Sequence, residues 1–225
     1  GTDTAAVLLN SPANPTGAVL PESTLAELVD LTIDTGTRLV VDEVYHGLSY
    51  GGRAASVLEF TDEAFVLDGF SKRFSMTGWR LGWMVVPESY VDPINRLAQN
   101  LLICAPHFVQ DAGVAALAVV DSHVPEMRET YRERRDFLVD AIEDLGLSLG
   151  YIPGGAYYLL VDVRELGDAF DVATDLLERA GVATTPGRDF GSRAAPFIRL
   201  SYATSMAQLE EAVDRLAGFL QTARA

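Results

Sequence analysis

Lys72 is the only lysine among the 17 lysine and arginine residues of the chain. Arginine holds every other basic position, so the remaining lysine is a candidate for chemistry that arginine cannot perform. A neutral lysine amine attacks carbonyl carbons and forms Schiff bases, and burial or neighbouring cations such as Arg73 and Arg80 favour the neutral form. The ordinary alternative is a solvated lysine at the rim of a strand.

A second candidate is Asp42, which directly follows the apolar residues 39–41. A carboxylate buried there needs a positively charged partner, because an unpaired buried charge is costly. A protonated pyridine nitrogen is such a partner, and the ion pair would keep the ring able to accept electrons. The alternative is a helix N-cap, a position that aspartate often fills between a strand and a helix.

Two arginines lie in settings that suit anions. Arg80 stands within residues 78–82, Gly-Trp-Arg-Leu-Gly, where a guanidinium fork and close backbone approach suit a phosphate ester. Arg199 lies between two apolar residues, so it needs an anionic ligand if its side chain points inward. The alternative for Arg80 is a surface arginine stacked on Trp79. The alternative for Arg199 is a strand position whose side chain points outward.

The elements that must position these residues alternate between strand and helix, which predicts a mostly parallel α/β sheet. Gly36 ends the first expected helix. The expected strands occupy residues 5–9, 38–41, 64–67 and 81–86. The expected helices occupy residues 22–35 and most of 88–120. Ligands bind beyond the carboxyl ends of parallel strands. Residues 10–17, 42–45 and 71–72 follow three of these strands, so an amide, a carboxylate, a phenol and an amine are expected to converge.

The second half of the chain has a different pattern. A long amphipathic helix is expected over residues 126–144, and Gly146 stops it. An α+β segment is expected to follow, with strands at 157–163 and near 196–202, a helix near 170–180 and a terminal helix from about 205. We expect a domain boundary near residues 120–126, with a large domain over 1–122 and a small one over 123–225.

Four groups of residues, in this order, resemble the class I and II aminotransferases of pyridoxal phosphate (PLP) fold type I. They are residues 14–17 (Asn-Pro-Thr-Gly), 42–45 (Asp-Glu-Val-Tyr), 71–80 (Ser-Lys at the start, Gly-Trp-Arg at the end) and 197–202 (Phe-Ile-Arg-Leu-Ser-Tyr). Smaller matches at residues 153–158 and 181–191 extend the resemblance over nearly the whole chain. It implies the α/β PLP-transferase fold, with helices on both faces of the sheet and a smaller α+β C-terminal domain.

The resemblance also implies roles toward the cofactor, pyridoxal 5′-phosphate. Lys72 would hold it as a Schiff base and then move a proton between the substrate's alpha carbon and the cofactor. Asp42 would pair with the ring nitrogen, while Asn14 and Tyr45 would hydrogen-bond the 3′ oxygen.

The remaining implied roles concern the phosphate and the substrate. Ser71 and Arg80 would bind the phosphate. Arg199 would bind the substrate's alpha-carboxylate in a bidentate pair, and Asn14 is also expected to bind substrate. Many relatives carry a serine three residues before the lysine as a further phosphate ligand, and here that position is Gly69. No metal site is expected, because the chain has too few cysteines and histidines to form one.

The expected activity is that of a PLP-dependent aminotransferase, which exchanges an amino group between an amino acid and a 2-oxo acid by a ping-pong mechanism. A C–S beta-lyase or another fold type I enzyme is the alternative within the same fold, and pyruvate release without added 2-oxo acid would favour it. A PLP-binding regulatory domain fused to a DNA-binding module is the alternative from another class. An inactive homologue is a third, disfavoured because the residues of the pattern are all present.

Family members are substantially longer at the N-terminus, and this chain shows no replacement for the phosphate-cradling turn found there. We therefore expect these 225 residues to be the C-terminal portion of a longer enzyme, poorly folded or inactive alone. The family also implies a homodimer whose active sites share residues across the interface.

Composition limits the classes of partner and compartment. The net charge of −15 repels nucleic acid and anionic membranes, so neither is expected as a partner. The sequence has no apolar run of membrane-spanning length and no secretory signal pattern, and Cys104 is its single cysteine, so the cytoplasm is expected. The acidic, lysine-poor composition fits either a halophile or a GC-rich genome, which stability in molar salt would separate.

Overall fold

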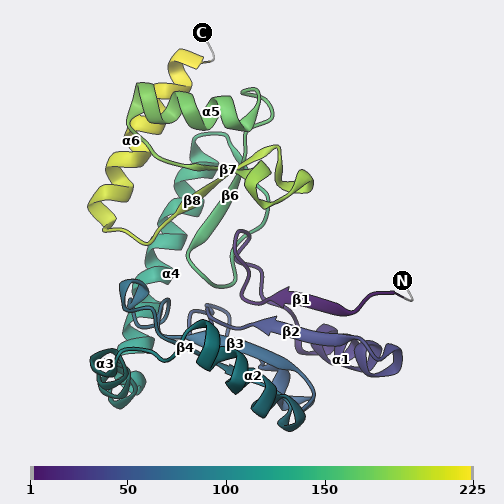
Figure 1. The fold of residues 1–225 in the computed structure, drawn as a ribbon. Coiled ribbons are helices and arrows are strands. Elements are labelled where there is room, and N and C mark those ends of the chain that lie inside the picture. The colour runs from purple at the N-terminus through teal and green to yellow at the C-terminus, as the bar shows by residue number, and fades with distance from the viewer. Residues whose placement is uncertain (1–2, 224–225) are drawn as a thin grey trace. The chain divides into compact units, whose positions relative to one another are not determined.

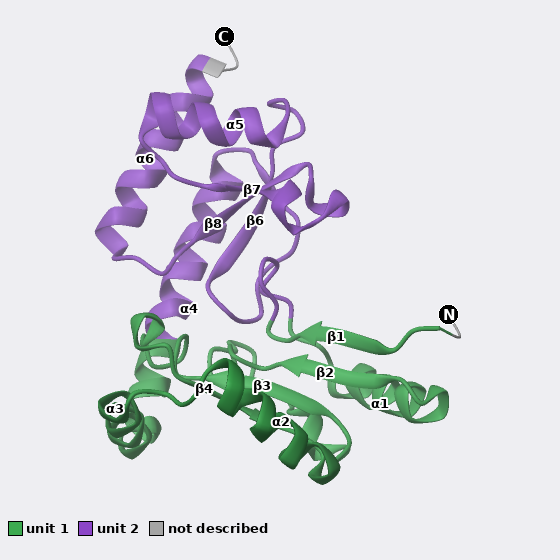
Figure 2. Ribbon diagram, in the orientation of Figure 1, with its two compact units in different colours: residues 1–12, 19–128 green, residues 13–18, 129–225 purple. Residues whose placement is uncertain are grey.

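The computed structural model describes residues 3–223, and the chain divides into two compact units (Figures 1 and 2). Unit 1 comprises Gly1–Pro12 and Val19–Arg128, and unit 2 comprises Ala13–Ala18 and Glu129–Ala225. The short segment 13–18 therefore belongs to the same unit as residues far along the chain.

Unit 1 is built on a four-stranded sheet in the order β1-β2-β3-β4 (Figure 1). The strands are β1 (Ala6–Asn10), β2 (Arg38–Asp42), β3 (Phe65–Gly69) and β4 (Gly82–Val85). β1, β2 and β3 run parallel, with Asn10 opposite Asp42 and Asp42 opposite Leu67, whereas β4 is antiparallel to β3. The carboxyl ends of the three parallel strands therefore meet at one edge of the sheet.

Helix α1 (Glu22–Thr35) packs against this sheet. It begins after the extended Pro21, carries Glu22 in its first turn, and ends at Gly36, whose φ of 67° lies in the left-handed region. Leu25 and Val29 on its inner face are each 3% exposed. Fully burying a side chain of this size contributes about 1.5–3 kcal/mol, and the residues that share this core include Leu39, Val41, Val57, Ala64 and Val66.

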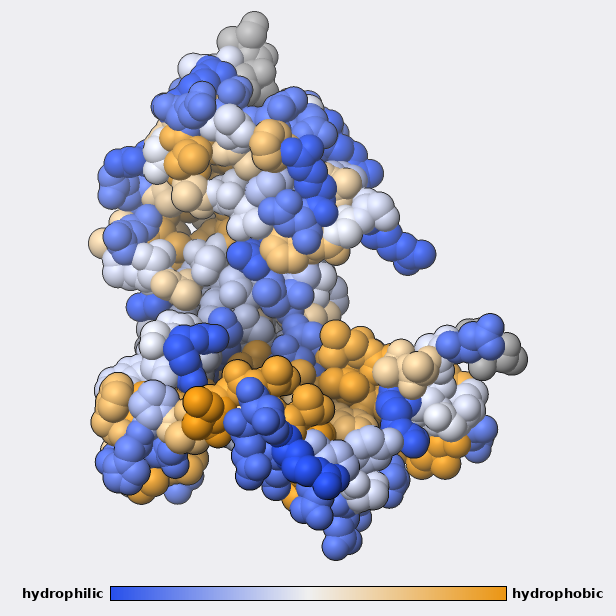
Figure 3. Space-filling view, viewed as in Figure 1, coloured by the Kyte–Doolittle hydropathy of each residue, from blue (hydrophilic) through white to orange (hydrophobic). Residues whose placement is uncertain are grey.

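Other parts of unit 1 leave apolar side chains exposed. Helix α2 (Glu88–Leu101) has no buried residue, and helix α3 (His107–Ala118) buries only two. Leu8 on β1 is 70% exposed, and Leu101 at the end of α2 is 74% exposed. Apolar residues gather visibly on this unit in Figure 3. Exposed apolar surface on a soluble protein usually marks contact with another surface.

Unit 2 combines a second sheet with helices. Helix α4 (Val120–Asp144) begins among the residues of unit 1 and continues into unit 2. The sheet has the order β5-β6-β8-β7 and only antiparallel pairs, and its strands are β5 (Ser148–Leu149), β6 (Tyr158–Asp162), β7 (Thr185–Pro186) and β8 (Phe197–Ser201). Helix α5 (Ala169–Asp175) passes into one π-helical turn at Leu176–Ala180, and α6 (Met206–Ala223) closes the unit.

The strands, helices and α/β class expected from the sequence are confirmed, with shifts of a few residues at their ends. The direction of β4 differs from the expectation, because an alternating strand–helix pattern predicts parallel strands and β4 is antiparallel to β3. The connection from β3 to β4 contains only a 3₁₀ turn (Thr77–Trp79) and no crossover helix, so β4 returns antiparallel. The two-residue strands β5 and β7 were not expected, because so short a segment has no period to detect.

Candidate active site

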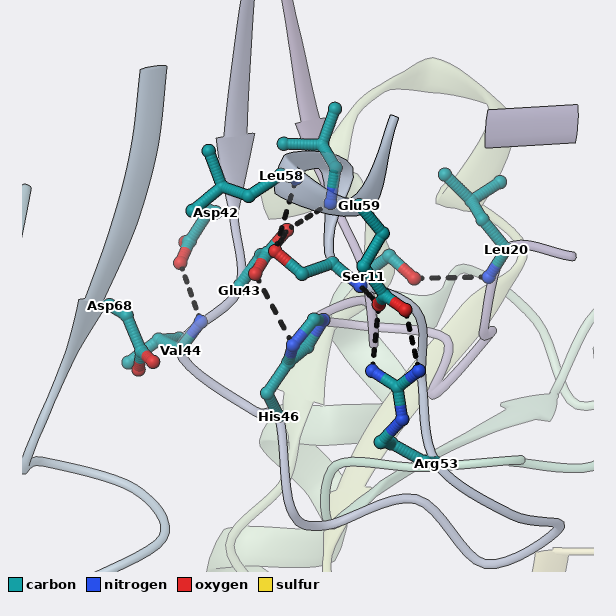
Figure 4. Close-up of polar contacts among 12 residues, drawn as sticks. Ser11, Leu20, Asp42, Glu43, Val44, His46, Arg53, Leu58, Glu59 and Asp68 are labelled. Atoms are coloured by element: carbon teal, nitrogen blue, oxygen red, sulfur yellow. Dashed lines mark hydrogen bonds and ion pairs between the residues drawn. The ribbon is translucent and has the colours of Figure 1, made fainter. Parts of the chain in front are cut away.

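Asp42 ends β2 at the edge where the three parallel strands finish. Its Oδ1 accepts a hydrogen bond from the Val44 backbone N–H at 3.1 Å (Figure 4). Asn10 Nδ2 donates to the Asp42 backbone carbonyl at 2.9 Å. The carboxylate therefore caps the turn that follows β2, where the sequence also allowed a helix N-cap. The carboxylate is half-buried, so it is available to a cationic group at this edge.

Lys72 and Tyr45 come from different strand ends and lie together. The Lys72 Nζ is 5.7 Å from the centroid of the Tyr45 ring, within the range of a cation–π contact. Tyr45 is buried at 3% exposure, whereas Lys72 is half-buried. The amine is thus held against a fixed aromatic ring and still reaches the edge of the sheet.

The space around Gly69 in unit 1 is too small for a side chain. A Cβ added to Gly69 would lie 2.9 Å from the Gly82 Cα and 3.0 Å from the Leu81 carbonyl oxygen on the paired strand β4. A serine here would force the backbone of β3 or β4 to move. The close approach of the two strands therefore favours glycine at position 69.

The two residues expected at the phosphate lie in the segment between β3 and β4. Arg80 ends the 3₁₀ turn with a φ of 56°, is exposed, and its Nη1 donates to the Thr77 carbonyl at 2.8 Å. Ser71 is half-buried beside Lys72. Arg80 is therefore anchored by one nitrogen and presents the rest of its guanidinium to solvent, which suits an anionic ligand.

Arg199 and Asn14 are brought together in unit 2. Arg199 Nη1 donates to Asn14 Oδ1 at 2.7 Å, and Nη2 donates to Thr185 Oγ1 at 3.3 Å. The guanidinium carbon lies 4.2 Å from the centroid of the Tyr158 ring and 4.8 Å from that of Phe190. Arg199 Nε is buried without a hydrogen-bond partner among the described residues. The half-buried guanidinium thus contacts two aromatic rings, Asn14 and Thr185.

The turn that carries Asn14 is fixed by the loop before β6. The backbone N–H groups of Gly154 and Gly155 both donate to the Gly17 carbonyl at 2.9 Å. A Cβ on Gly17, whose φ is 68°, would lie 2.5 Å from Pro153 Cβ, so only glycine fits at this contact. The sequence matches at residues 14–17 and 153–158 therefore pack on each other within unit 2.

A buried acidic group lies next to the Asp42 turn, and the sequence did not single it out. Glu43 is 4% exposed, and its Oε1 accepts from Ser56 Oγ at 3.1 Å and from the Val57 backbone N–H at 2.9 Å (Figure 4). His46 Nδ1 lies 3.3 Å from Glu43 Oε2. Burial lowers the pKa of His46, although the Glu43 carboxylate opposes this shift.

A second pair overlooked in the sequence is Asp68 with Arg73. Arg73 Nη2 and Asp68 Oδ2 are 2.5 Å apart, and Asp68 Oδ1 accepts from the Gly69 backbone N–H at 2.6 Å. Burial raises the pKa of Asp68 to about 6, against the opposing effect of the Arg73 guanidinium. The only sequence signal for this pair was the short spacing of opposite charges around Lys72.

Two kinds of feature are absent from residues 3–223. No group of three or more histidine, cysteine, aspartate or glutamate side chains is arranged to hold a metal ion. None of the helices in this range combines the length and the apolar character needed to cross a bilayer.

Residues 1–216 match the family described as aminotransferase class I and II. The chain is 37% identical over 222 residues to an aspartate aminotransferase of Thermotoga maritima, covering 97% of this chain and 57% of that protein. It is 37% identical over 218 residues to an arginine–pyruvate transaminase of Pseudomonas aeruginosa, covering 95% of this chain and 56% of that protein. The chain thus spans little more than half the length of these relatives.

Solved structures that are similar to this chain are also aminotransferases. An aromatic aminotransferase from Pyrococcus horikoshii superimposes with a TM-score of 0.93 at 33% identity, covering 100% of this chain and 62% of that one. An aspartate aminotransferase from Thermus thermophilus with maleate gives a TM-score of 0.91 at 37% identity, covering 97% of this chain and 57% of that one.

Proposed function

The chain belongs to the class I and II aminotransferase family, and from this premise we propose that the protein is a PLP-dependent aminotransferase acting on an amino acid and a 2-oxo acid. The observation that carries the proposal is the contact between Lys72, the only lysine, and the buried Tyr45 at the edge of the sheet that also bears Asp42. An amine, a phenol and a carboxylate at one edge are the donor set that a pyridoxal ring requires.

The chemistry of these side chains fits pyridoxal phosphate. When bound, this cofactor supplies an aldehyde that condenses with amines and a protonated ring that accepts electrons from the substrate's alpha carbon. Lys72 Nζ would hold the cofactor and, once displaced by the substrate amine, would take the proton from the alpha carbon. The Asp42 carboxylate would keep the ring nitrogen protonated, because an ion pair favours the charged form.

Three further side chains would orient the cofactor. Tyr45 and Asn14 would donate hydrogen bonds to its 3′ oxygen. Arg80 would bind the phosphate with the guanidinium nitrogens left over from its bond to Thr77, and Ser71 would add a hydroxyl. With glycine at position 69, the phosphate would depend more on these two residues than in relatives that carry a serine there.

Arg199 would bind the alpha-carboxylate that all amino acids and 2-oxo acids share. The rings of Tyr158 and Phe190 flank its guanidinium and limit its contact with water, which strengthens a charged hydrogen bond. Binding of this shared group lets one site serve both half-reactions. Names among the relatives include aspartate, aromatic and arginine aminotransferases, so the donor side chain is left to a substrate screen.

The proposal is tested with the purified full-length protein and pyridoxal phosphate. We expect a visible absorbance band that is absent from a Lys72→Ala variant and that disappears when the correct amino acid is added. A 2-oxo acid should then restore it. A folded protein that gives no Lys72-dependent band would overturn the proposal, and pyruvate release without added 2-oxo acid would favour the lyase alternative.

The assembly and compartment are parts of the same proposal. We infer a homodimer in the cytoplasm, as is usual for this family. Light scattering of the full-length protein tests the first inference, and a mass of one chain would contradict it.

A further inference from the structure

The segment that carries Lys72 is closed by an ion pair between its two ends. Asp68 lies on β3, and Arg73 directly follows Lys72. Arg73 Nη2 meets Asp68 Oδ2 at 2.5 Å, with side-chain exposures of 19% for the arginine and 10% for the aspartate. The other aspartate oxygen, Oδ1, accepts from the Gly69 N–H. Asp68 is thus bound both to the end of its own strand and to the residue after the lysine.

Aromatic rings hold the arginine from other sides. The guanidinium carbon of Arg73 lies 5.4 Å from the centroid of the Trp83 ring and 5.6 Å from that of Phe74. Trp83 is the partner of Asp68 across the β3–β4 pair, and its ring packs edge-on against Phe70 at 5.2 Å. The Arg73 guanidinium is therefore contacted by the Asp68 carboxylate and by two aromatic rings.

This position constrains Lys72 through the backbone. Adjacent alpha carbons are held at a fixed separation of ~3.8 Å, so anchoring Arg73 limits the positions that Lys72 can take. The two side chains also have different contacts, because Arg73 pairs with Asp68 while the Lys72 amine reaches the Tyr45 ring. If the ion pair were lost, the segment would gain freedom and the amine would leave Tyr45 for part of the time.

The pair also balances charge at the sheet edge. The carboxylates of Glu43 and Asp42 are close enough to disfavour a further negative charge on Asp68. The Arg73 guanidinium compensates that charge locally. The same guanidinium also disfavours protonation of His46, so Arg73 acts on several groups around the turn that carries Tyr45.

We propose that Asp68 and Arg73 are positioning residues that hold the Lys72 amine against Tyr45 in the orientation needed to attack the cofactor aldehyde. The proposal rests on the proposed function, in which Lys72 bonds to pyridoxal phosphate. The pair takes no part in the bond itself. Its contribution is to the rate at which the amine and the aldehyde meet in a reactive geometry.

The test measures how fast the cofactor-free, full-length protein attaches pyridoxal phosphate at pH 7.5. Stopped-flow absorbance gives the rate, and borohydride reduction followed by peptide mass spectrometry identifies Lys72 as the attachment site. The variants are Asp68→Asn, which keeps an oxygen for the Gly69 N–H, Arg73→Gln, and the double variant. Glu59→Gln is the matched control, because it breaks the Arg53–Glu59 ion pair elsewhere in unit 1.

We expect each single variant to attach the cofactor on the order of tenfold more slowly or worse. The double variant should be no slower than the slower single one, and the control should match the unmodified protein. A purely structural pair would lower the melting temperature without changing the attachment rate far below it. Rates within twofold of the unmodified protein would overturn the proposal, as would an Asp68→Asn variant that cannot fold. No adduct on Lys72 in the unmodified protein would instead refute the proposed function.

Discussion

Arg199 and Asn14 are joined by a hydrogen bond of 2.7 Å although 185 positions separate them in the sequence. In this bond Nη1 of the guanidinium donates to the Asn14 Oδ1 atom. Under the proposed function, Asn14 would position the guanidinium that binds the substrate carboxylate.

Replacing Arg199 with lysine tests the carboxylate site. Lysine keeps the charge but loses the planar fork, so kcat/KM for the amino acid should fall roughly 10- to 100-fold, as expected for the loss of about 1.5–3 kcal/mol from a charged hydrogen bond. Steady-state kinetics on the full-length protein measure this. Arg179→Lys is the control, because Arg179 also stacks on an aromatic ring, at 5.4 Å from the centroid of Phe219. Equal losses in the two variants would contradict the assignment.

Replacing Asp42 with asparagine separates its two suggested roles. Asparagine keeps an oxygen for the Val44 N–H, so the turn after β2 should persist, but the negative charge is lost. We expect kcat to fall by roughly 100-fold, because the ring nitrogen would lose the charge that keeps it protonated, at a cost of about 3 kcal/mol. The absorbance of the cofactor on Lys72 should remain. A variant with unchanged kcat would show that Asp42 matters only as a cap of the turn after β2.

Gly69→Ser tests the close approach of β3 and β4. Because the added Cβ meets the Gly82 backbone at 2.9 Å, we expect a loss of about 1–3 kcal/mol of stability, measured by urea unfolding of the full-length protein. Gly78→Ser is the matched control, since a Cβ there meets nothing within 4 Å. Equal stability of the two variants would show that β3 and β4 can separate at no cost.

The local structure was largely predictable from the sequence because it depends on neighbouring residues. The apolar spacing in residues 22–35 and the glycine at position 36 were enough to place helix α1, and continuous apolar runs were enough to place β2 and β3. Spacing carries no information on strand direction, so the antiparallel β4 was not anticipated. The roles of the site residues stay predictions.

Side-chain partners were harder to predict, because the fold chooses them. Arg199 was recognised as an anion-binding candidate. Its contacts with Tyr158 and Phe190 depend on two strands, β6 and β8, and on the 3₁₀ turn that ends at Phe190. Asp68 and Arg73 looked like ordinary charges near Lys72. Their pairing needs Trp83 on the next strand, which no local pattern reveals.

The pKa of Asp68 predicts a specific pH dependence of stability. Its folded-state value of about 6 lies above the usual 3.8, so the folded protein binds this proton more tightly than the unfolded chain. The resulting stabilisation is complete below about pH 4 and is lost as the pH rises through about 6. Between these values the unmodified protein should lose at most about 3 kcal/mol relative to Asp68→Asn, as measured by urea unfolding at each pH. A constant difference, or one of opposite sign, would contradict this.

The exposed apolar side chains of unit 1 predict how the 225-residue chain behaves alone. Leu8, Leu101 and Ile103 are between 70% and 80% exposed, and helix α2 has no buried residue. Surface of this kind binds other apolar surface, because removing it from water stabilises by about 25 cal/mol per Å². We therefore expect the isolated chain to bind the dye anilinonaphthalene sulfonate strongly, to self-associate in light scattering, and to show no transaminase turnover. The full-length protein is the control and should bind far less dye. A monodisperse, fully active 225-residue chain would show that this surface is tolerated in water.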